Sequence, residues 1–391
     1  MIFPIGDTPT PRGAVPAVTY LIIVLNVAVY FLWTLPLSET PPSPTDPVLQ
    51  AYLETMSRAL DRARVQALLG NLSAYDLFVF RWGFRPADPT VATTFASMFL
   101  HAGFVHLFGN MLFLWIYGDN VEHRLGHLRY LIAYLASGVV AVWFHALSAR
   151  SSPIPLVGAS GAISGVLGFY FLFFPRNRVK MLWFLPPFVF QTFEVPARIV
   201  LGFYIVLDNI LPYLFTSADV GVSRGAHIGG FFLGVAGAWW ISRRDATRRP
   251  EEYAAVAPEE RPVSETIGEM IRTGRVAEAA RAYFALPASA TVRLLTPDHS
   301  LVLARWLAGQ GHEDAALVVL RRLIRDFPSG AHFAEACALA GDLLRKLGQD
   351  TAAYQYYLAA LDEAQTGLAA EAARRGVAAI EASQNRPTRW T

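Results

Sequence analysis

A run of 20 consecutive residues without a formal charge, residues 18–37, is the feature that most constrains this chain. At a rise of about 1.5 Å per residue, a helix of this length crosses the roughly 30 Å hydrocarbon core of a bilayer. Arg12 is the only basic residue before the run, and no A-x-A-like cleavage site follows it. The pattern therefore predicts an uncleaved transmembrane helix and not a signal peptide.

Charge divides the chain into two parts. Residues 1–250 carry 18 basic and 13 acidic residues, whereas residues 251–391 carry 15 basic and 18 acidic residues in little more than half the length. Further apolar segments lie at 103–118, 128–148, 156–174, 197–215 and 226–242. We therefore expect six transmembrane helices within residues 1–245, a linker at 246–262 and a soluble domain at 263–385.

Basic residues indicate the orientation of the six spans, which place both chain ends on one side. With the N-terminus inside, the inner segments hold these basic residues: Arg12, Arg124, Arg129, Arg176, Arg178, Lys180, Arg198, Arg243, Arg244, Arg248 and Arg249. The short outer loops hold only Arg150 and Arg224. The positive-inside rule then predicts cytoplasmic N- and C-termini. The strong use of Arg over Lys suggests a GC-rich bacterial genome. We therefore expect a multi-pass protein of a bacterial inner (plasma) membrane.

The long outer loop, residues 38–95, is expected to contain a helix at 47–69. Asp46 followed by Pro47 is typical of a helix N-cap and first helical position, and leucines recur at helical spacing after it. This helix could lie on the outer membrane surface or belong to a small packed subdomain, and the sequence leaves both open. On the inner side, the apolar, proline-broken stretch 181–195 predicts a re-entrant or hairpin segment and not a seventh span.

A repeat of 37 residues appears in the second part of the chain. Its three copies begin with a glycine, followed five residues later by an alanine and four residues after that by a large apolar residue. The copies are Gly274, Ala279, Tyr283; Gly311, Ala316, Leu320; and Gly348, Ala353, Tyr357. The pattern resembles the tetratricopeptide repeat and predicts helical hairpins at about 263–287, 299–327 and 332–364 with a capping helix at 367–382. An unrelated helical bundle is the alternative.

Polar residues within the apolar segments point to a reactive site. His101, His106 and Asn110 begin the second segment, Ser160 the fourth and His227 the sixth. All three segments run from outside to inside, so these side chains share one depth near the outer face. Each has a simpler reading when taken alone, because Ser and Asn often join transmembrane helices and a His can sit at the interface. Together they favour chemistry, since polar groups in lipid are costly.

Small residues would let the fourth and sixth segments approach closely. Glycines repeat on both, at Gly161, Gly165 and Gly168 and at Gly230, Gly234 and Gly237. Close approach would allow a hydrogen bond between Ser160 and His227, which a serine nucleophile needs because its hydroxyl is weak until a base takes the proton. The helix N-terminus at Ser160, with His106 and Asn110, would stabilise an oxyanion. No carboxylate is placed to orient His227, so we expect a dyad.

These motifs resemble the rhomboid family of intramembrane serine proteases. The matching runs are H-x4-H-x3-N (His101, His106, Asn110), G-x-S-G (Gly158, Ser160, Gly161) and A-H-x2-G-x3-G (Ala226, His227, Gly230, Gly234), over about residues 15–245. Together with the repeat, the resemblance predicts an all-α fold, a six-helix transmembrane bundle followed by the soluble helical repeat domain. It also implies that Ser160 attacks transmembrane or juxtamembrane segments of membrane-protein substrates with His227 as base, and that His106 and Asn110 complete the oxyanion hole.

Further roles follow from the same resemblance. Glu122 or Arg124 would brace an inner loop, the fifth segment would be the movable side through which substrate enters, and no metal or cofactor would be needed. Asp208 and Asn209 depart from an apolar fifth segment, and the charge of Asp208 could line the cavity or sit near the outer interface. We favour the cavity.

Other function classes fit less well. A net charge of +2 without a basic cluster argues against nucleic acid as a partner, and the single cysteine, Cys337, excludes an intrachain disulfide and a cysteine zinc cluster. A catalytically inactive rhomboid-like scaffold for transmembrane clients is the main alternative, although such a protein would be expected to lose Ser160 or His227. A transporter would show an inverted repeat, and none is visible. Expected partners are transmembrane substrates, membrane lipid and a protein bound by the repeat domain.

Overall fold

The computed structural model describes residues 2–11, 15–59, 66, 69–70, 72–185, 189–215, 223–247, 267–286, 291 and 294–384. The chain forms two compact units. The first comprises Met1–Thr8 with Ala14–Ala238, and the second comprises Pro9–Gly13 with Trp239–Thr391. Residues 248–266, which include most of the predicted linker, lie outside the described residues. The domain boundaries therefore stay predictions.

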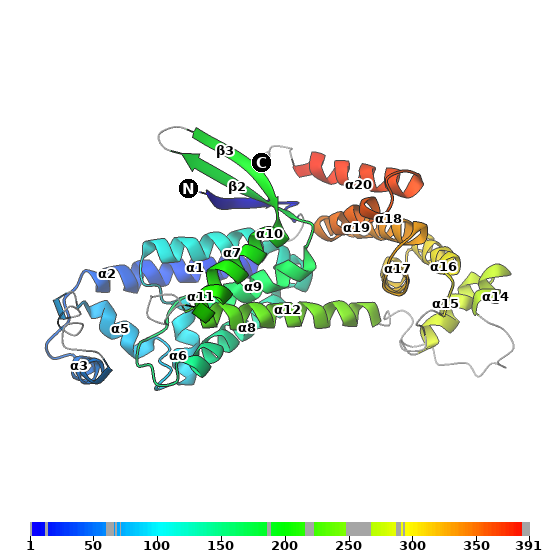
Figure 1. The fold of residues 1–391 in the computed structure, drawn as a ribbon. Helices are drawn as coiled ribbons and strands as arrows, with labels where there is room; N and C mark the ends of the chain where they lie inside the picture. Colours follow the sequence, from blue (N-terminus) through cyan, green and yellow to red (C-terminus); the bar gives the residue numbers. More distant parts are fainter. Residues whose placement is uncertain are drawn as a thin grey trace. The chain divides into compact units, whose positions relative to one another are not determined.

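Each of the six apolar segments contains a helix (Figure 1). Two of the helices continue through a π-helical turn into a short α-helix. The helices are α1 (Ala17–Val29) with η1 (Tyr30–Thr34) and α2 (Leu35–Ser38), α7 (Phe104–Leu125), α8 (His127–Ser148), α9 (Ser160–Phe173), α10 (Ala197–Ile205) with η3 (Val206–Ile210) and α11 (Leu211–Phe215), and α12 (Arg224–Thr247).

Not every one of these helices is long and apolar enough by itself to cross a membrane. Among the described residues, three are, over Ala17–Ser38, His127–Ser148 and Ala197–Phe215. A fourth is added if Val91–Phe99 and Phe104–Leu125, which meet at an angle of 89°, form one span. Helix α9 has 14 residues, about 21 Å of helix, and its residues from Gly161 to Tyr170 are all buried. Because other helices enclose α9, it does not have to meet lipid along its length, and the count of six spans stays a prediction.

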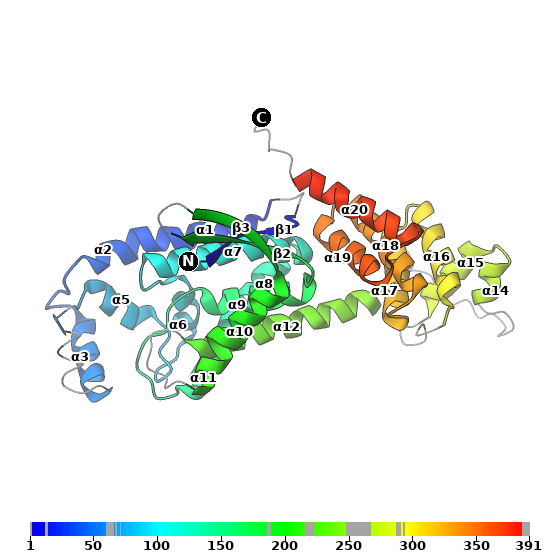
Figure 2. The ribbon, with the colours of Figure 1, turned by 45° about the horizontal axis from the view of Figure 1, so that its top comes forward.

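A three-stranded antiparallel sheet corrects the all-α expectation. Strand β2 (Arg178–Leu185) is central, between β1 (Ile2–Thr8) and β3 (Val189–Pro196), as Figure 2 shows. Ile2 pairs with Trp183 and Thr8 with Arg178, while β2 and β3 pair from Arg178 with Pro196 to Leu185 with Val189. The stretch 181–195 thus forms a hairpin, one of the two predicted alternatives. Its aromatic and β-branched residues suit a pleated surface better than a helix.

Asp7 attaches β1 to the ends of two bundle helices. Its Oδ2 accepts hydrogen bonds from Asn120 Nδ2 on α7 (2.9 Å), from the Tyr170 hydroxyl on α9 and from Asn177 Nδ2 (3.4 Å). Burial raises the pKa of the Asp7 carboxyl well above its usual range, the nearby Asp119 raises it further, and the three donors oppose this shift. The N-terminal strand is therefore held by a buried polar cluster as well as by the sheet.

Glu122 on α7 caps the N-terminus of α1. Its carboxylate accepts the backbone N–H groups of Val18 (2.9 Å) and Thr19 (2.7 Å) and the Thr19 hydroxyl (2.7 Å). His127 Nδ1 lies 2.5 Å from the same carboxylate, and the Glu122 side chain is 1% exposed. The first N–H groups of a helix have no intrahelical acceptors, so this carboxylate satisfies them and complements the helix dipole.

Replacing Glu122 by alanine is expected to lower the free energy of unfolding by about 3 kcal/mol, because buried donors on α1 lose their acceptor. Thermal unfolding in detergent measures this effect. His127→Ala is the matched control, since the His127 side chain touches the same carboxylate but is half exposed. Equal melting temperatures for the two variants would contradict the capping role.

The outer loop forms a small packed subdomain, one of the two alternatives that the sequence left open. Helix α3 (Pro47–Ala59) begins with Val48 N–H donating to Asp46 Oδ1 at 2.8 Å. The core between α3 and α5 (Ala74–Trp82) consists of Tyr52, Met56, Leu77 and Phe80. Several residues of the predicted helix beyond Ala59 lie outside the described part of the chain.

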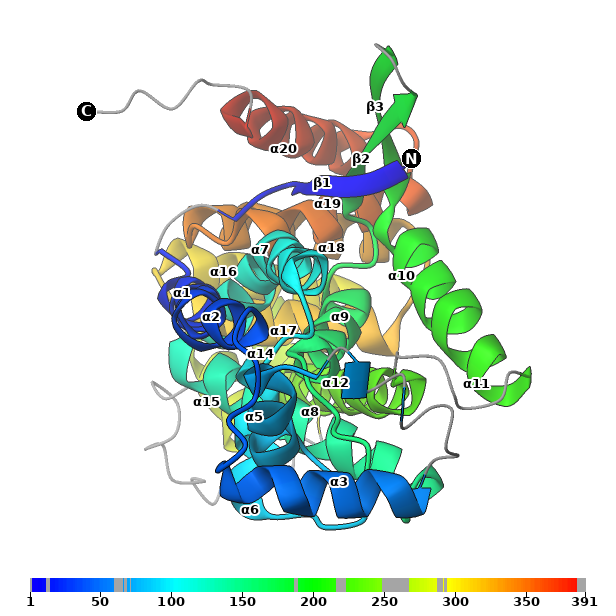
Figure 3. The same cartoon turned by 90° about the vertical axis from the view of Figure 1, so that its left-hand side faces the viewer.

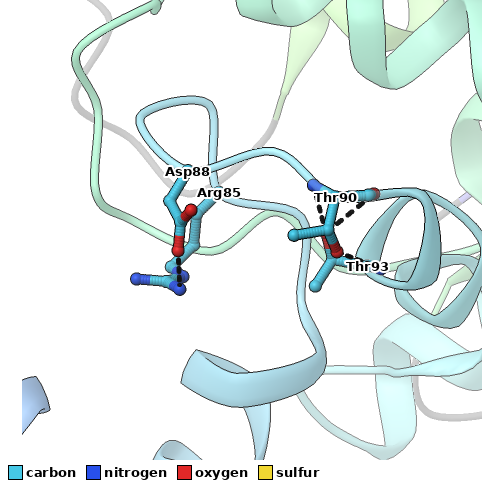
Figure 4. A network of polar contacts seen from close by, with 4 residues as sticks. All are labelled: Arg85, Asp88, Thr90 and Thr93. Atoms are coloured by element: carbon cyan, nitrogen blue, oxygen red, sulfur yellow. Dashed lines mark hydrogen bonds and ion pairs between the residues drawn. The ribbon is translucent and has the colours of Figure 1, made fainter.

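The loop then leads into the membrane bundle through α6 (Val91–Ala96) and the short helix η2 (Ser97–Phe99). Thr90 and Thr93 form a reciprocal capping box at the start of α6, and an Arg85–Asp88 ion pair precedes it (Figure 4). Phe84 forms an isolated antiparallel bridge with Leu156, just before α9. The outer loop is thus joined to the segment that carries Ser160.

The second unit consists of helix pairs with one further helix. The helices are α14 (Ile267–Arg272), α15 (Val276–Ala285), α16 (Pro297–Gly309), α17 (Glu313–Asp326), α18 (Ala331–Lys346), α19 (Asp350–Glu363) and α20 (Leu368–Gln384).

Repeat glycines connect the two helices of each pair. Gly274, Gly311 and Gly348 have φ values of 81°, 82° and 72°, a conformation that ends a helix and favours glycine. The repeat alanines and the large residues four positions later are all buried. Whether these pairs are tetratricopeptide repeats stays a prediction.

Candidate active site

Ser160 is the first residue of α9 and lies next to an unusual backbone position. Gly158, two residues earlier, has a φ of 125°, and its N–H donates to the carbonyl of Ser97 at 2.9 Å. A Cβ on Gly158 would lie 2.8 Å from His106 Cε1 and 3.7 Å from Ser160 Oγ. Glycine is therefore required at 158 by both the backbone and the space, because a side chain there would collide with His106.

Ser160 and His227 are in hydrogen-bond contact. Ser160 Oγ lies 2.8 Å from His227 Nε2, across 67 residues of sequence. His227 is in the first turn of α12, so the two side chains come from the starts of two neighbouring helices. A hydroxyl held this close to an imidazole can pass its proton to the ring and become a nucleophile.

Glycines permit the contact between α9 and α12. A Cβ on Gly230 would lie 2.1 Å from the carbonyl oxygen of Gly161, and one on Gly234 would lie 2.0 Å from that of Gly165. Both distances are far below any real contact, so the backbones of the two helices touch directly. These four glycines set the helix separation at which Ser160 meets His227.

Asn209 contacts the other nitrogen of His227. Its Oδ1 lies 2.7 Å from His227 Nδ1, and its side chain is 1% exposed. The predicted dyad therefore has a third neighbour: an amide, and not a carboxylate, lies against the histidine. Asp208 is exposed, and the interpretation that its charge lines the cavity stays a prediction.

Tyr204 on α10 is a second residue that the sequence analysis missed. Its hydroxyl lies 2.7 Å from Ser164 Oγ, and the Ser164 hydroxyl donates to the Ser160 carbonyl at 2.8 Å. The Tyr204 ring centroid is 6.2 Å from that of His227, with 34° between the planes. Figure 3 shows α10 and α11 along one side of the unit, near α9 and α12. In the sequence, the polar pair Asp208–Asn209 within an apolar segment was the signal that the fifth segment contributes to the site.

His106 and Asn110 lie one helical turn apart on α7. Asn110 is buried, and its Nδ2 has no hydrogen-bond partner among the described residues. His101 is buried just before α7, with its ring 5.2 Å from that of His106, and its carbonyl accepts the Tyr75 hydroxyl at 2.8 Å. A buried amide donor without an acceptor costs free energy in the resting protein, and it suits a group that receives an anion during a reaction.

Metal chemistry has no visible ligand set in the described part of the chain. No three or more His, Cys, Asp or Glu side chains are grouped there as a metal ion requires. Cys337 is buried in α18 of the second unit. The reactive groups of the candidate site are a hydroxyl, an imidazole and amide donors.

Part of the chain is similar to known proteins. Residues 88–244, which include Ser160, His227 and Asn209, match the Rhomboid domain family. Similar proteins include the Rhomboid protease GluP of Bacillus subtilis, 36% identical over 137 residues, and Rhomboid protein 1, mitochondrial, of Saccharomyces cerevisiae, 28% identical over 168 residues. The Rhomboid protease GlpG of Yersinia pestis is 24% identical over 148 residues.

The matched regions cover 35%, 41% and 38% of this chain and 24%, 44% and 47% of those three proteins, respectively. The chain thus matches less than half the length of each relative. Residues 88–244 are similar to the Rhomboid domain, and with its apolar helices the chain is a multi-pass membrane protein.

Proposed function

We propose that this protein is an intramembrane serine endopeptidase of the rhomboid type, which cleaves transmembrane or juxtamembrane segments of membrane proteins. The contact of 2.8 Å between Ser160 Oγ and His227 Nε2, inside the region matched by the rhomboid family, is the observation that carries the proposal. Two of the similar proteins, GluP and GlpG, are named rhomboid proteases, which supports the same activity.

In the proposed reaction, Ser160 Oγ attacks the scissile carbonyl while His227 Nε2 takes its proton. His227 then gives that proton to the leaving amine, and an acyl-enzyme remains on Ser160. Water, deprotonated by His227, hydrolyses this ester and restores the serine. The Ser160 N–H at the start of α9, with His106 and Asn110, stabilises the oxyanion of each tetrahedral intermediate.

The proposed arrangement in the membrane follows from the charges in the sequence. Six spans with both termini in the cytoplasm place Ser160 and His227 near the outer face, where water can reach them. The helical repeats of the second unit would then bind a protein partner on the inner side. A topology reporter fused after residue 250 is expected to be located in the cytoplasm. Reporter activity outside the membrane would contradict this topology.

Labelling by a serine-reactive fluorophosphonate in detergent tests the activity. The wild-type chain is expected to become labelled, whereas Ser160→Ala and His227→Ala are not. Equal labelling of wild type and Ser160→Ala would remove Ser160 as nucleophile. Absence of labelling in a folded wild-type chain would favour the inactive scaffold.

Asn110→Ala is expected to lower turnover by roughly 10²–10³, the usual effect of losing one oxyanion donor. Its stability should hold or rise slightly, because the buried Asn110 Nδ2 has no acceptor among the described residues. Rates of fluorophosphonate labelling, together with melting temperatures, check both effects. Near-wild-type rates would exclude Asn110 from the oxyanion hole.

A further inference from the structure

Asn209 lies in a π-helical turn in the middle of an otherwise α-helical span. The turn is η3, between α10 and α11, and single π-helical turns within α-helices often occur at functional sites. Its neighbours Val206 and Leu207 are 42% and 43% exposed, whereas Asn209 is buried. The wider turn therefore directs one polar side chain inward from an apolar, mainly exposed segment.

The hydrogen bonds of Asn209 determine which way its amide faces. Asn209 Nδ2 donates to the carbonyl oxygen of Tyr204 at 2.8 Å. A carbonyl oxygen only accepts hydrogen bonds, so the amide nitrogen must face Tyr204 and the amide oxygen must face His227. The opposite amide orientation would place two oxygens against each other.

The amide orientation in turn determines the protonation of His227. Asn209 Oδ1 can only accept, so His227 Nδ1 must carry the hydrogen across the 2.7 Å contact. In the neutral ring, Nε2 is then unprotonated and directs its lone pair to Ser160 Oγ at 2.8 Å. This is the tautomer that can accept the serine proton.

Tyr204 adds a second connection from the same segment. Because the Ser164 hydroxyl donates to the Ser160 carbonyl, the Tyr204 hydroxyl donates to Ser164 Oγ. The segment Ala197–Phe215 thereby reaches α9 through Tyr204 and α12 through Asn209. Both halves of the Ser160–His227 pair are held from one side.

We propose that Asn209 is a positioning residue, which holds His227 in the tautomer that activates Ser160 and so makes a Ser–His–Asn arrangement. This inference rests on the proposed protease function. In Ser-His-Asp triads a carboxylate plays the corresponding part. Replacing that carboxylate by an amide there puts the histidine in the wrong tautomer. Here the bond from Asn209 Nδ2 to Tyr204 removes that ambiguity, because it leaves only the oxygen for His227.

The test measures the rate of fluorophosphonate labelling against pH for the full chain in detergent. Asn209→Ala is expected to label at least about tenfold more slowly, because the ring loses the bond that selects its tautomer. Asn209→Asp should regain much of the rate at alkaline pH. Its half-maximal pH should rise, because a carboxylate favours the charged ring, which is not a base. Asp208→Asn, at the exposed neighbouring position, is the matched control and should follow the wild-type profile.

A wild-type labelling rate in Asn209→Ala, or a wild-type pH profile in Asn209→Asp, would overturn the inference. If Asn209→Ala does not fold, the pH profile of the nearly isosteric Asn209→Asp tests the inference instead.

Nitrogen NMR of histidine-labelled protein gives a readout that does not need activity. His227, assigned from the spectrum of His227→Ala, should show a protonated Nδ1 and an unprotonated Nε2 in the wild type and a tautomer mixture in Asn209→Ala. The reverse tautomer in the wild type would sink the inference by itself. Absence of labelling in the wild type would sink only the proposed function.

Discussion

The Ser160→Ala variant is expected to lose cleavage of a fluorogenic transmembrane peptide in proteoliposomes by at least about 10⁴-fold. Without Oγ no acyl-enzyme can form, and only the oxyanion donors remain. His227→Ala should lose nearly as much, because an unassisted serine hydroxyl is a poor nucleophile. The double variant should be no slower than either single variant, since the two groups act as one unit.

The control for this prediction is the melting temperature of each variant, which reports whether the fold is intact. Ser160 and His227 are each only partly buried, so their truncation should change the melting temperature little. Losses that add up in the double variant, or cleavage retained by Ser160→Ala, would contradict a shared role for the two residues in one chemical step.

Gly234→Ala is expected to be the most damaging single-methyl change in the membrane unit. Its Cβ would lie 2.0 Å from the Gly165 carbonyl oxygen and 3.0 Å from the Phe169 backbone nitrogen, and neither backbone atom can move aside as a side chain could. Forcing α12 away from α9 should cost roughly 3 kcal/mol of stability. A shift of about 1 Å at the Ser160–His227 contact should also slow catalysis by about 10²-fold.

Gly202→Ala provides the matched control. Gly202 is also a helical glycine, on α10, but a Cβ there would meet no atom within 4 Å. Its substitution should leave the rate unchanged and raise stability slightly, because alanine favours helix more than glycine does. Melting temperatures and peptide cleavage rates of both variants compare the two directly. Equal behaviour would mean that α9 and α12 do not touch through their glycines.

Helical elements could be predicted from the sequence because their signals are local. Uncharged runs such as 18–37 and glycine-spaced repeats such as Gly274 and Gly311 specify helices by length, periodicity and termination. The sheet could not be predicted this way. Strand β1 is seven residues of mixed character, and its partner lies about 170 residues away in sequence. Pairing of this kind leaves little local pattern.

The candidate site, too, could be predicted only in part. The approach of Ser160 to His227 could be predicted because glycine spacing on two helices implies a close contact. The contribution of Asn209 could not, because regular α-helical spacing does not say which of Asp208 and Asn209 faces inward once a π-helical turn intervenes. Only the backbone of η3 shows that the amide is buried and the carboxylate is exposed.

Mapping the fluorophosphonate adduct by mass spectrometry tests the central claim most directly. We expect one adduct per chain, on the peptide that contains Ser160, and no adduct after His227→Ala or Ser160→Ala. An adduct on another residue, or one that persists in Ser160→Ala, would contradict the claim that Ser160 is the nucleophile of a membrane protease.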